Sequence, residues 1–458
     1  MNRVMGTALL GLMALICGLS AVSALADSQA RIVRLSDVQG SVQIDQATGQ
    51  GYERAFLNLP VHQGMRLRTT TDSRAEVEFE DGSLIHLTPD TVLQFTDLSL
   101  RDSGGKVSTV AVQHGQAYFD FHGQKDDEFT VTFGPEKAKL TGPTHFRVSL
   151  KDTSASLAVF NGVIQVQGPA GEVEIAKKQT ATFDLAQNGQ FELARNIEKD
   201  PSDAWDEQQI EYHERYLAKS SQGPYPYTYG LSDLNYYGAF LDLAGYGSCW
   251  QPYFTGLGWD PFMDGAWMWD PNFGYWWVSA YPWGWMPYHY GSWMYAGGGT
   301  GWCWLPGDTW VNYYVPVFRP PLFHPPRFGP HRPPLGSGHV VPVGHGLTTS
   351  TLQTKNGPPS LLVVQPGDAG LSIPRGVRNL KEINREFAQM GQVTLRVSAP
   401  RSSSANLAAM PMPRVSLAGS PASSMGHAGP GSSMSAHAST PAAPAPSLSA
   451  QTSSGSHK

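Results

Sequence analysis

The sequence predicts a mainly β protein with one short helix and a long tail of low complexity. Apolar and polar residues alternate in short runs over residues 31–185, as they do in half-buried strands. A tryptophan-rich segment over 225–316 repeats with a period of about 27 residues, which indicates one small unit used several times. Residues 317–458 are rich in Pro, Gly, Ser and Ala, a composition typical of disordered chain.

The first 26 residues have the features of a secretory signal peptide. Arg3 supplies the positive start, an apolar stretch covers 4–22, and the sequence Ala-Leu-Ala at 24–26 fits the small-x-small cleavage pattern. No later stretch has the roughly 18 consecutive apolar residues that a membrane-spanning helix needs. We therefore expect an exported protein, periplasmic or secreted, without an integral membrane span after signal cleavage.

Residues 31–185 predict an all-β domain. Over Arg74–Glu80 every second residue is apolar, which predicts a strand with one face in water. Asp-Gly at 81–82 and Asn-Gly at 161–162 separate such runs and supply the positive φ angles of tight hairpins. No long helical pattern interrupts the runs.

An ordered series of segments in this domain resembles the FecR-like family. The segments are Val38–Val42, Gly64–Thr69, Ser73–Phe79, Asp81–Leu87, Pro89–Leu93, Gly115–Phe119 and Gly142–Val148. The resemblance implies a small β-solenoid-like or sandwich-like periplasmic domain that takes part in protein contact. In the best-known members it relays the state of an outer-membrane iron–siderophore receptor to a sigma-factor regulator. We do not expect direct transmembrane signalling here, because neither a cytoplasmic anti-sigma segment nor a retained membrane helix precedes the domain.

One helix is expected over 200–219, between the two folded parts. Asp200 is a suitable N-cap, and Pro201 fits the first helical position. Trp205 and Tyr212 are seven residues apart and therefore share a face. We expect that face to pack against one of the neighbouring domains.

The segment 225–316 predicts three repeated units, each a strand, a Gly-containing turn and a second strand. Three sets of residues recur at spacings of 26 or 27, namely Gly247, Gly274 and Gly301, then Trp250, Trp277 and Trp304, then Phe240, Trp267 and Trp293. The segment also resembles an uncharacterised bacterial family found behind FecR-like domains, through 250–252, 259–261 and 282–291. That family has no assigned activity to carry over.

Cys249 and Cys303 are the two cysteines outside the signal segment, and each directly precedes a repeated Trp. In an oxidising compartment we expect them to form an internal disulfide, with free thiols or an intermolecular bond as alternatives. Trp276 occupies the equivalent position of the middle unit, so we expect it on the same face as the cysteines.

Two interpretations compete for the aromatic residues: a buried core, or an exposed platform that stacks on sugar rings or binds a partner. We expect most rings in the core and a minority exposed at positions outside the repeat register. The candidate ligand-binding residues are Trp276, Trp283, Tyr288, His289, Tyr290 and Trp310.

The tail is expected to be largely disordered, with one ordered island within 360–399. Its strands are expected at 361–364 and 393–397, and its helix near 377–388. The island is either a docking element or a weakly structured remainder. The tail histidines are irregularly spaced, so we expect no metal site.

No catalytic pattern is found in the sequence, and we expect neither enzyme activity nor a cofactor. In an enzyme, Asp260, Asp264 or Asp270 would act as acid and base, but these residues fall at turns, where Asp ordinarily caps the backbone. A formal net charge of −6 argues against nucleic-acid binding. The favoured hypothesis is an exported, non-enzymatic envelope protein that contacts an envelope protein partner in assembly or signalling. The alternative is binding of a cell-wall polysaccharide or exopolysaccharide through exposed Trp and Tyr.

Overall fold

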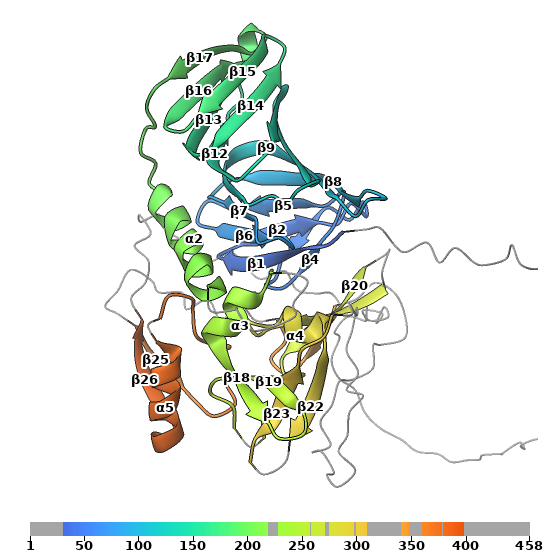
Figure 1. Ribbon diagram of the computed structural model, residues 1–458, viewed down its shortest axis with the longest axis vertical. Helices are drawn as coiled ribbons and strands as arrows, with labels where there is room; N and C mark the ends of the chain where they lie inside the picture. The colour runs from blue at the N-terminus through green and yellow to red at the C-terminus, as the bar shows by residue number, and fades with distance from the viewer. Residues whose placement is uncertain are drawn as a thin grey trace, which may run out of the picture. The chain divides into compact units, whose positions relative to one another are not determined.

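The structure is a computed structural model (Figure 1), and the predicted mainly β class is confirmed. It describes residues 31–218, 228–256, 258–270, 274–296, 299–308, 340–347, 360–377 and 379–397. The predicted signal segment, Trp310 and most of the tail lie outside these residues. Within the described part of the chain, no helix is both long enough and apolar enough to cross a membrane.

The first domain consists of two β-sheets that share strand β9. One sheet runs in the order β4 (Pro60–Val61), β1 (Val33–Gln39), β6 (Arg74–Glu78), β7 (Leu84–Leu87), β9 (Lys106–Phe121), β12 (Thr144–Leu150), β13 (Ser154–Asn161), β16 (Gln179–Asp184), β17 (Gln190–Ala194). The other runs β3 (Tyr52–Arg54), β2 (Val42–Asp45), β5 (Arg66–Thr69), β8 (Val92–Leu100), β9, β10 (Glu128–Phe133), β11 (Glu136–Leu140), β14 (Val163–Gly168), β15 (Gly171–Ala176). Apolar residues of both sheets form one buried core, as in a sandwich.

Strand β9 passes from one sheet to the other at Gly115. Up to His114 the strand pairs with β8, and from Gly115 onward it pairs with β12. Gly115 has a φ of +84°, and a Cβ atom there would lie 2.3 Å from the carbonyl oxygen of Asp90. Only glycine fits such a position. The residues on either side of this point therefore belong to one bent strand.

The predicted linker helix is α2 (Asp203–Leu217), and it is followed by α3 (Leu231–Tyr237). Trp205 packs against His86 of the first domain, with ring centroids 5.4 Å apart, and Tyr212 packs against Tyr236 of α3, also at 5.4 Å. The aromatic face of α2 therefore contacts both parts of the chain, where the sequence predicted one.

The 27-residue period corresponds to three β-hairpins. They are β18 (Gly238–Leu243) with β19 (Gly247–Pro252), β20 (Gly265–Asp270) with β21 (Gly274–Ser279), and β22 (Ser292–Ala296) with β23 (Gly301–Leu305). The recurring glycines all adopt a φ near +80°, which a tight turn requires. The other two recurring sets are cross-strand partners, pairing Phe240 with Trp250, Trp267 with Trp277, and Trp293 with Trp304.

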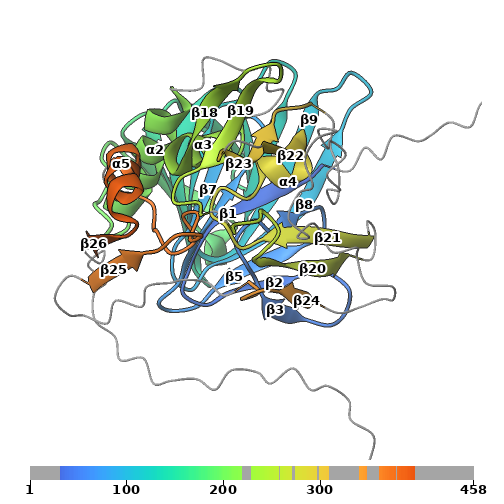
Figure 2. The same cartoon turned by 90° about the horizontal axis from the view of Figure 1, so that it is seen from below.

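The hairpins do not form one continuous array. The first and third share a four-stranded sheet, β18-β19-β23-β22, and the short helix α4 (Met286–His289) precedes the third. Cys249 on β19 and Cys303 on β23 lie at disulfide distance, with Cα atoms 5.8 Å apart. The middle hairpin pairs instead with β24 (Val341–Val343) and lies beside the first domain (Figure 2). Placing Trp276 on the cysteine face was therefore wrong, because its hairpin belongs to a different sheet.

The island in the tail is ordered and packs on the hairpins. It comprises β25 (Ser360–Val364), α5 (Leu380–Met390) and β26 (Val393–Val397), close to the predicted positions. The Phe387 ring contacts that of Phe254 at 5.4 Å, and Asn384 Oδ1 accepts a hydrogen bond from Phe254 N at 3.0 Å. Of the two interpretations left open, the docking element fits these contacts.

Candidate functional site

The aromatic residues predicted to form an exposed platform are buried wherever the structure describes them. The exposed fraction is 2% or less for Trp276, Trp283, Tyr288, His289 and Tyr290. The prediction of exposure was wrong for these residues because their rings pack on one another and on neighbouring aromatic side chains.

Trp283 illustrates how the rings are covered. Its ring stacks on Tyr281 at 4.9 Å and contacts Trp250 at the same distance. Its indole N–H donates to the carbonyl oxygen of Ala369, 86 residues later in the chain, at 2.6 Å. The segment that covers Trp283 thus comes from the predicted tail, and no local pattern could reveal this.

His289 and the turn aspartates make structural contacts. The His289 ring packs against Trp276 at 5.9 Å and Trp285 at 4.6 Å. Asp260 Oδ1 accepts a hydrogen bond from a backbone N–H two residues later, which is the turn-capping role that the sequence favoured. Asp264 accepts a hydrogen bond from the His345 backbone N–H at 2.9 Å.

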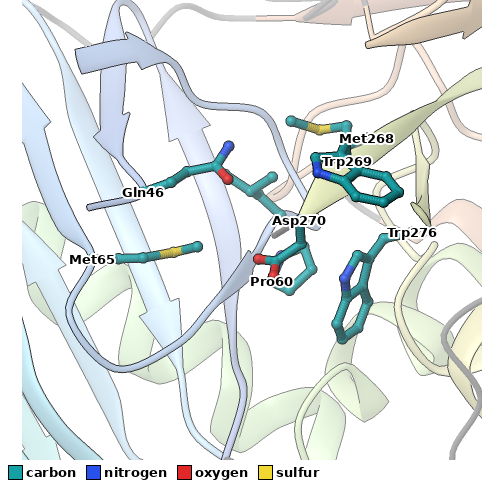
Figure 3. A pocket seen from close by; sticks show the side chains of 8 residues that line it. Gln46, Pro60, Met65, Met268, Trp269, Asp270 and Trp276 are labelled. Carbon is teal, nitrogen blue, oxygen red and sulfur yellow. The ribbon is translucent and has the colours of Figure 1, made fainter. Parts of the chain in front are cut away.

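A small pocket lies between the first domain and the middle hairpin (Figure 3). It has an empty volume of about 280 Å³, which includes space open to solvent. The lining residues are Gln46, Leu59, Pro60, Met65, Met268, Trp269, Asp270 and Trp276. His62 Nε2 lies 2.8 Å from Asp270 Oδ2 and joins the two parts. Trp276 therefore lies at the contact between the middle hairpin and the first domain.

The most distinctive polar feature is a cluster of charged side chains beneath α2 and α3, which we call the ionic junction. Its members are Arg34, Glu76, Glu78, His213, Asp233 and Arg375. Four of them, Arg34, Glu76, Glu78 and Asp233, have fully buried side chains. The first domain, the helices and the tail island all contribute residues, so the junction connects these three parts of the chain.

Glu76 on β6 is the centre of the junction. Its Oε1 accepts hydrogen bonds from Arg375 Nη1 at 2.7 Å and from Ser36 Oγ at 2.7 Å, and it lies 2.9 Å from His213 Nε2. Its Oε2 lies 3.2 Å from His86 Nε2. Buried charges are tolerated only when they are paired in this way.

Arg34 on β1 joins the first domain to the hairpins. Its guanidinium contacts Glu78 at 3.1 Å and Asp233 at 2.6 Å, and it donates to the carbonyl oxygen of Pro282 at 2.8 Å. The Arg375 guanidinium also reaches Asp233, at 3.0 Å. Each arginine therefore bridges a strand carboxylate and the carboxylate of α3.

The electrostatics of the junction follow from burial and pairing. Burial alone raises the pKa of Glu76, but Arg375 and His213 outweigh it and hold that pKa well below its usual range. Burial lowers the pKa of His86, but Asp206 and Glu76 outweigh it and raise the pKa to about 10. Glu78 differs, because burial dominates there and raises its pKa.

The prediction that β6 has one face in water was wrong. Glu76 and Glu78 do lie on its polar face, but that face is covered by protein. The alternation of apolar and polar residues in the sequence is the same whether the polar face contacts water or buried residues of opposite charge. A partial signal was Arg34 between the apolar residues Val33 and Leu35, since a buried arginine requires carboxylate partners.

Comparisons with known proteins agree with this division of the chain. Residues 65–165 match the family described as FecR protein, and residues 231–320 match a family of unknown function (DUF6600). The chain therefore contains a FecR domain followed by a region of that second family, as the resemblances implied. Among curated proteins, none matches the chain.

Two crystal structures of a "putative anti-sigma factor" from Parabacteroides distasonis are similar to part of the chain. In both cases the identity is 18%, the TM-score is 0.27, and the match covers 31% of this chain. The match spans 64% of the length of that protein. A likeness of this size carries no argument about what this chain does.

Proposed function

We propose that this chain is an exported, non-enzymatic envelope protein that acts through protein contact in assembly or signalling. Its FecR domain is the contact domain, and the hairpins together with the tail island form its support. The observation that supports this is the ionic junction, through which one sheet face of the FecR domain already binds a second protein module. The buried charge pairs there have the chemistry of a specific protein interface.

Burial of the aromatic residues argues for protein contact and against binding of a polysaccharide. Stacking on a sugar requires an accessible ring face, and the rings of Trp276, Trp283 and Tyr288 pack on neighbouring side chains instead. In this conformation the aromatic residues stabilise the support.

In-cell photo-crosslinking tests the proposal. A photoreactive amino acid replaces Val163, which is 48% exposed on β14 of the FecR domain, in the cells that make the protein. The matched control replaces Tyr246, which is 40% exposed in the first hairpin. We expect a reproducible adduct with one envelope protein from position 163 only. No adduct at either position contradicts the proposal, and an adduct from 246 alone contradicts the role of the FecR domain.

Export is tested by the mass of the mature chain. We expect protein from the envelope fraction to lack the first 26 residues, which form the predicted signal. A full-length chain recovered from the cytoplasmic fraction would overturn this part of the proposal.

A further inference from the structure

Strand β17 is an edge strand with an exposed apolar face. It follows the 3-10 helix η1 (Leu185–Gln187) and pairs only with β16 among the described strands. Phe191 and Leu193 stand opposite the buried residues Phe183 and Ala181, so they lie on the face that points toward the sandwich core. They are nevertheless 39% and 41% exposed. An uncovered edge of this kind is a template for pairing with another strand.

A buried carboxylate lies next to this edge. Glu136, at the start of β11, is 2% exposed, and its Oε1 has no hydrogen-bond partner among the described residues. A Cβ atom on Gly189, the residue before β17, would lie 2.4 Å from that oxygen. A buried carboxylate oxygen without a partner is costly, and a cation at the start of β17 would remove the cost.

The chain itself carries a suitable cation directly after β17. Arg195 is exposed and makes no ion pair with any described residue. Alternate residues of a strand share a face, so Phe191 and Leu193 share the core-facing side, and Gly189 and Arg195 flank β17 directly at its two ends.

We propose that two copies of this chain pair through antiparallel β17 strands, about a two-fold axis at Glu192. In this register Phe191 faces Leu193 of the partner subunit, and Gly189 faces Arg195 of the partner subunit. Each arginine then lies beside the Glu136 carboxylate of the other copy. The two apolar residues cover each other, and the free edges become the centre of a continuous sheet. The surface is self-complementary, as a two-fold interface must be.

The same register predicts one unfavourable contact. Glu192 faces its own copy across the axis on the opposite side of the sheet, and like charges placed directly opposite are destabilising. The paired strands are also short, so the buried area is small and the dimer is weak. We expect a Kd on the order of tens of micromolar.

Sedimentation velocity of the purified full chain over a range of concentrations tests the proposal. We expect Arg195→Glu and Glu136→Gln each to weaken dimerisation at least tenfold. The double variant is expected to be no weaker than Arg195→Glu alone, because both changes remove the same contact. Glu192→Gln is expected to strengthen the dimer several-fold. The matched control, Lys199→Glu, reverses another exposed charge and should change the Kd less than twofold.

Thermal melts of each variant separate a loss of pairing from a loss of folding. Hydrogen exchange gives a second readout, since the amides of Gln190–Ala194 should become protected as concentration rises. A chain that stays monomeric at all concentrations overturns the inference, as does a dimer unaffected by Arg195→Glu and Glu136→Gln. Neither result bears on the proposed envelope partner, which the crosslinking experiment tests separately.

Discussion

At the scale of single residues, stability depends on rings and charges whose partners are distant in sequence. Trp283 is covered by the tail island, and Glu76 is neutralised by Arg375. Both contacts are buried, where the loss of one partner leaves a cavity or an unpaired charge.

Trp283→Ala should destabilise the protein by about 3–5 kcal/mol, because it removes a fully buried ring from a packed aromatic cluster. Urea unfolding followed by tryptophan fluorescence measures this change. Phe240→Ala is the control, since that ring is 36% exposed and should cost far less. If Trp283→Ala is as stable as the wild type and loses binding to a polysaccharide, the core assignment fails.

Arg375→Ala should cost about 3–5 kcal/mol, because it leaves the carboxylates of Glu76 and Asp233 buried without their shared counter-charge. Arg385→Ala provides the comparison, since Arg385 is an exposed residue of α5 and its loss should be nearly neutral. Equal unfolding midpoints for the two variants would show that Arg375 does not support the junction.

At the scale of elements, the hairpins were predictable because their signals are local. Gly247, Gly274 and Gly301 mark turns that only a residue tolerant of positive φ can make, and the recurring aromatics are cross-strand partners. The sheet to which each hairpin belongs was not predictable. Nothing within the middle unit shows that β20 pairs with β24, whose residues Val341–Val343 come more than 70 positions later.

The bond between Cys249 and Cys303 should contribute about 4 kcal/mol, since it closes a loop with a sequence separation of 54 residues. We expect the double variant Cys249→Ser with Cys303→Ser to lose about this much stability in guanidinium unfolding. Wild-type protein treated with a reductant should match the variant. Two titratable thiols in protein isolated without reductant would contradict the pairing.

At the scale of the whole molecule, the tail island is part of the folded body. A chain that ends after residue 397 should keep the melting temperature of the full chain, because every described element is retained. A chain that ends after residue 347 loses Arg375 and the contacts that cover Phe254 and Trp283. We expect it to melt at a clearly lower temperature and to bind a hydrophobic dye. Identical melting of the two truncated chains would contradict the docking of the island.

Glu76 of the junction and its neighbour His86 also predict how stability depends on pH. The pKa of His86 is raised in the folded state, so its contribution is complete below pH 6.5 and is lost as pH rises toward 10. The pKa of Glu76 is lowered in the folded state, so its contribution is complete above pH 4.5 and is lost as pH falls. Both contributions are therefore complete between pH 4.5 and 6.5. In chemical unfolding over a pH series, His86→Gln should reduce the decline on the alkaline side, and an unchanged profile would contradict the assignment.

The hydrogen bond from Arg375 to Glu76 also constrains the order in which the chain can fold. It joins residues 299 positions apart, so β6 is synthesised long before Arg375 is added to the chain. Contacts between distant residues form late, because the entropy of closing so long a loop must first be overcome. During synthesis, the Glu76 carboxylate therefore stays without Arg375 until most of the chain has been made. We expect a slow last phase of refolding that Arg375→Ala abolishes. A molecule in which Glu76 has not yet met Arg375 therefore differs from the complete fold at this face.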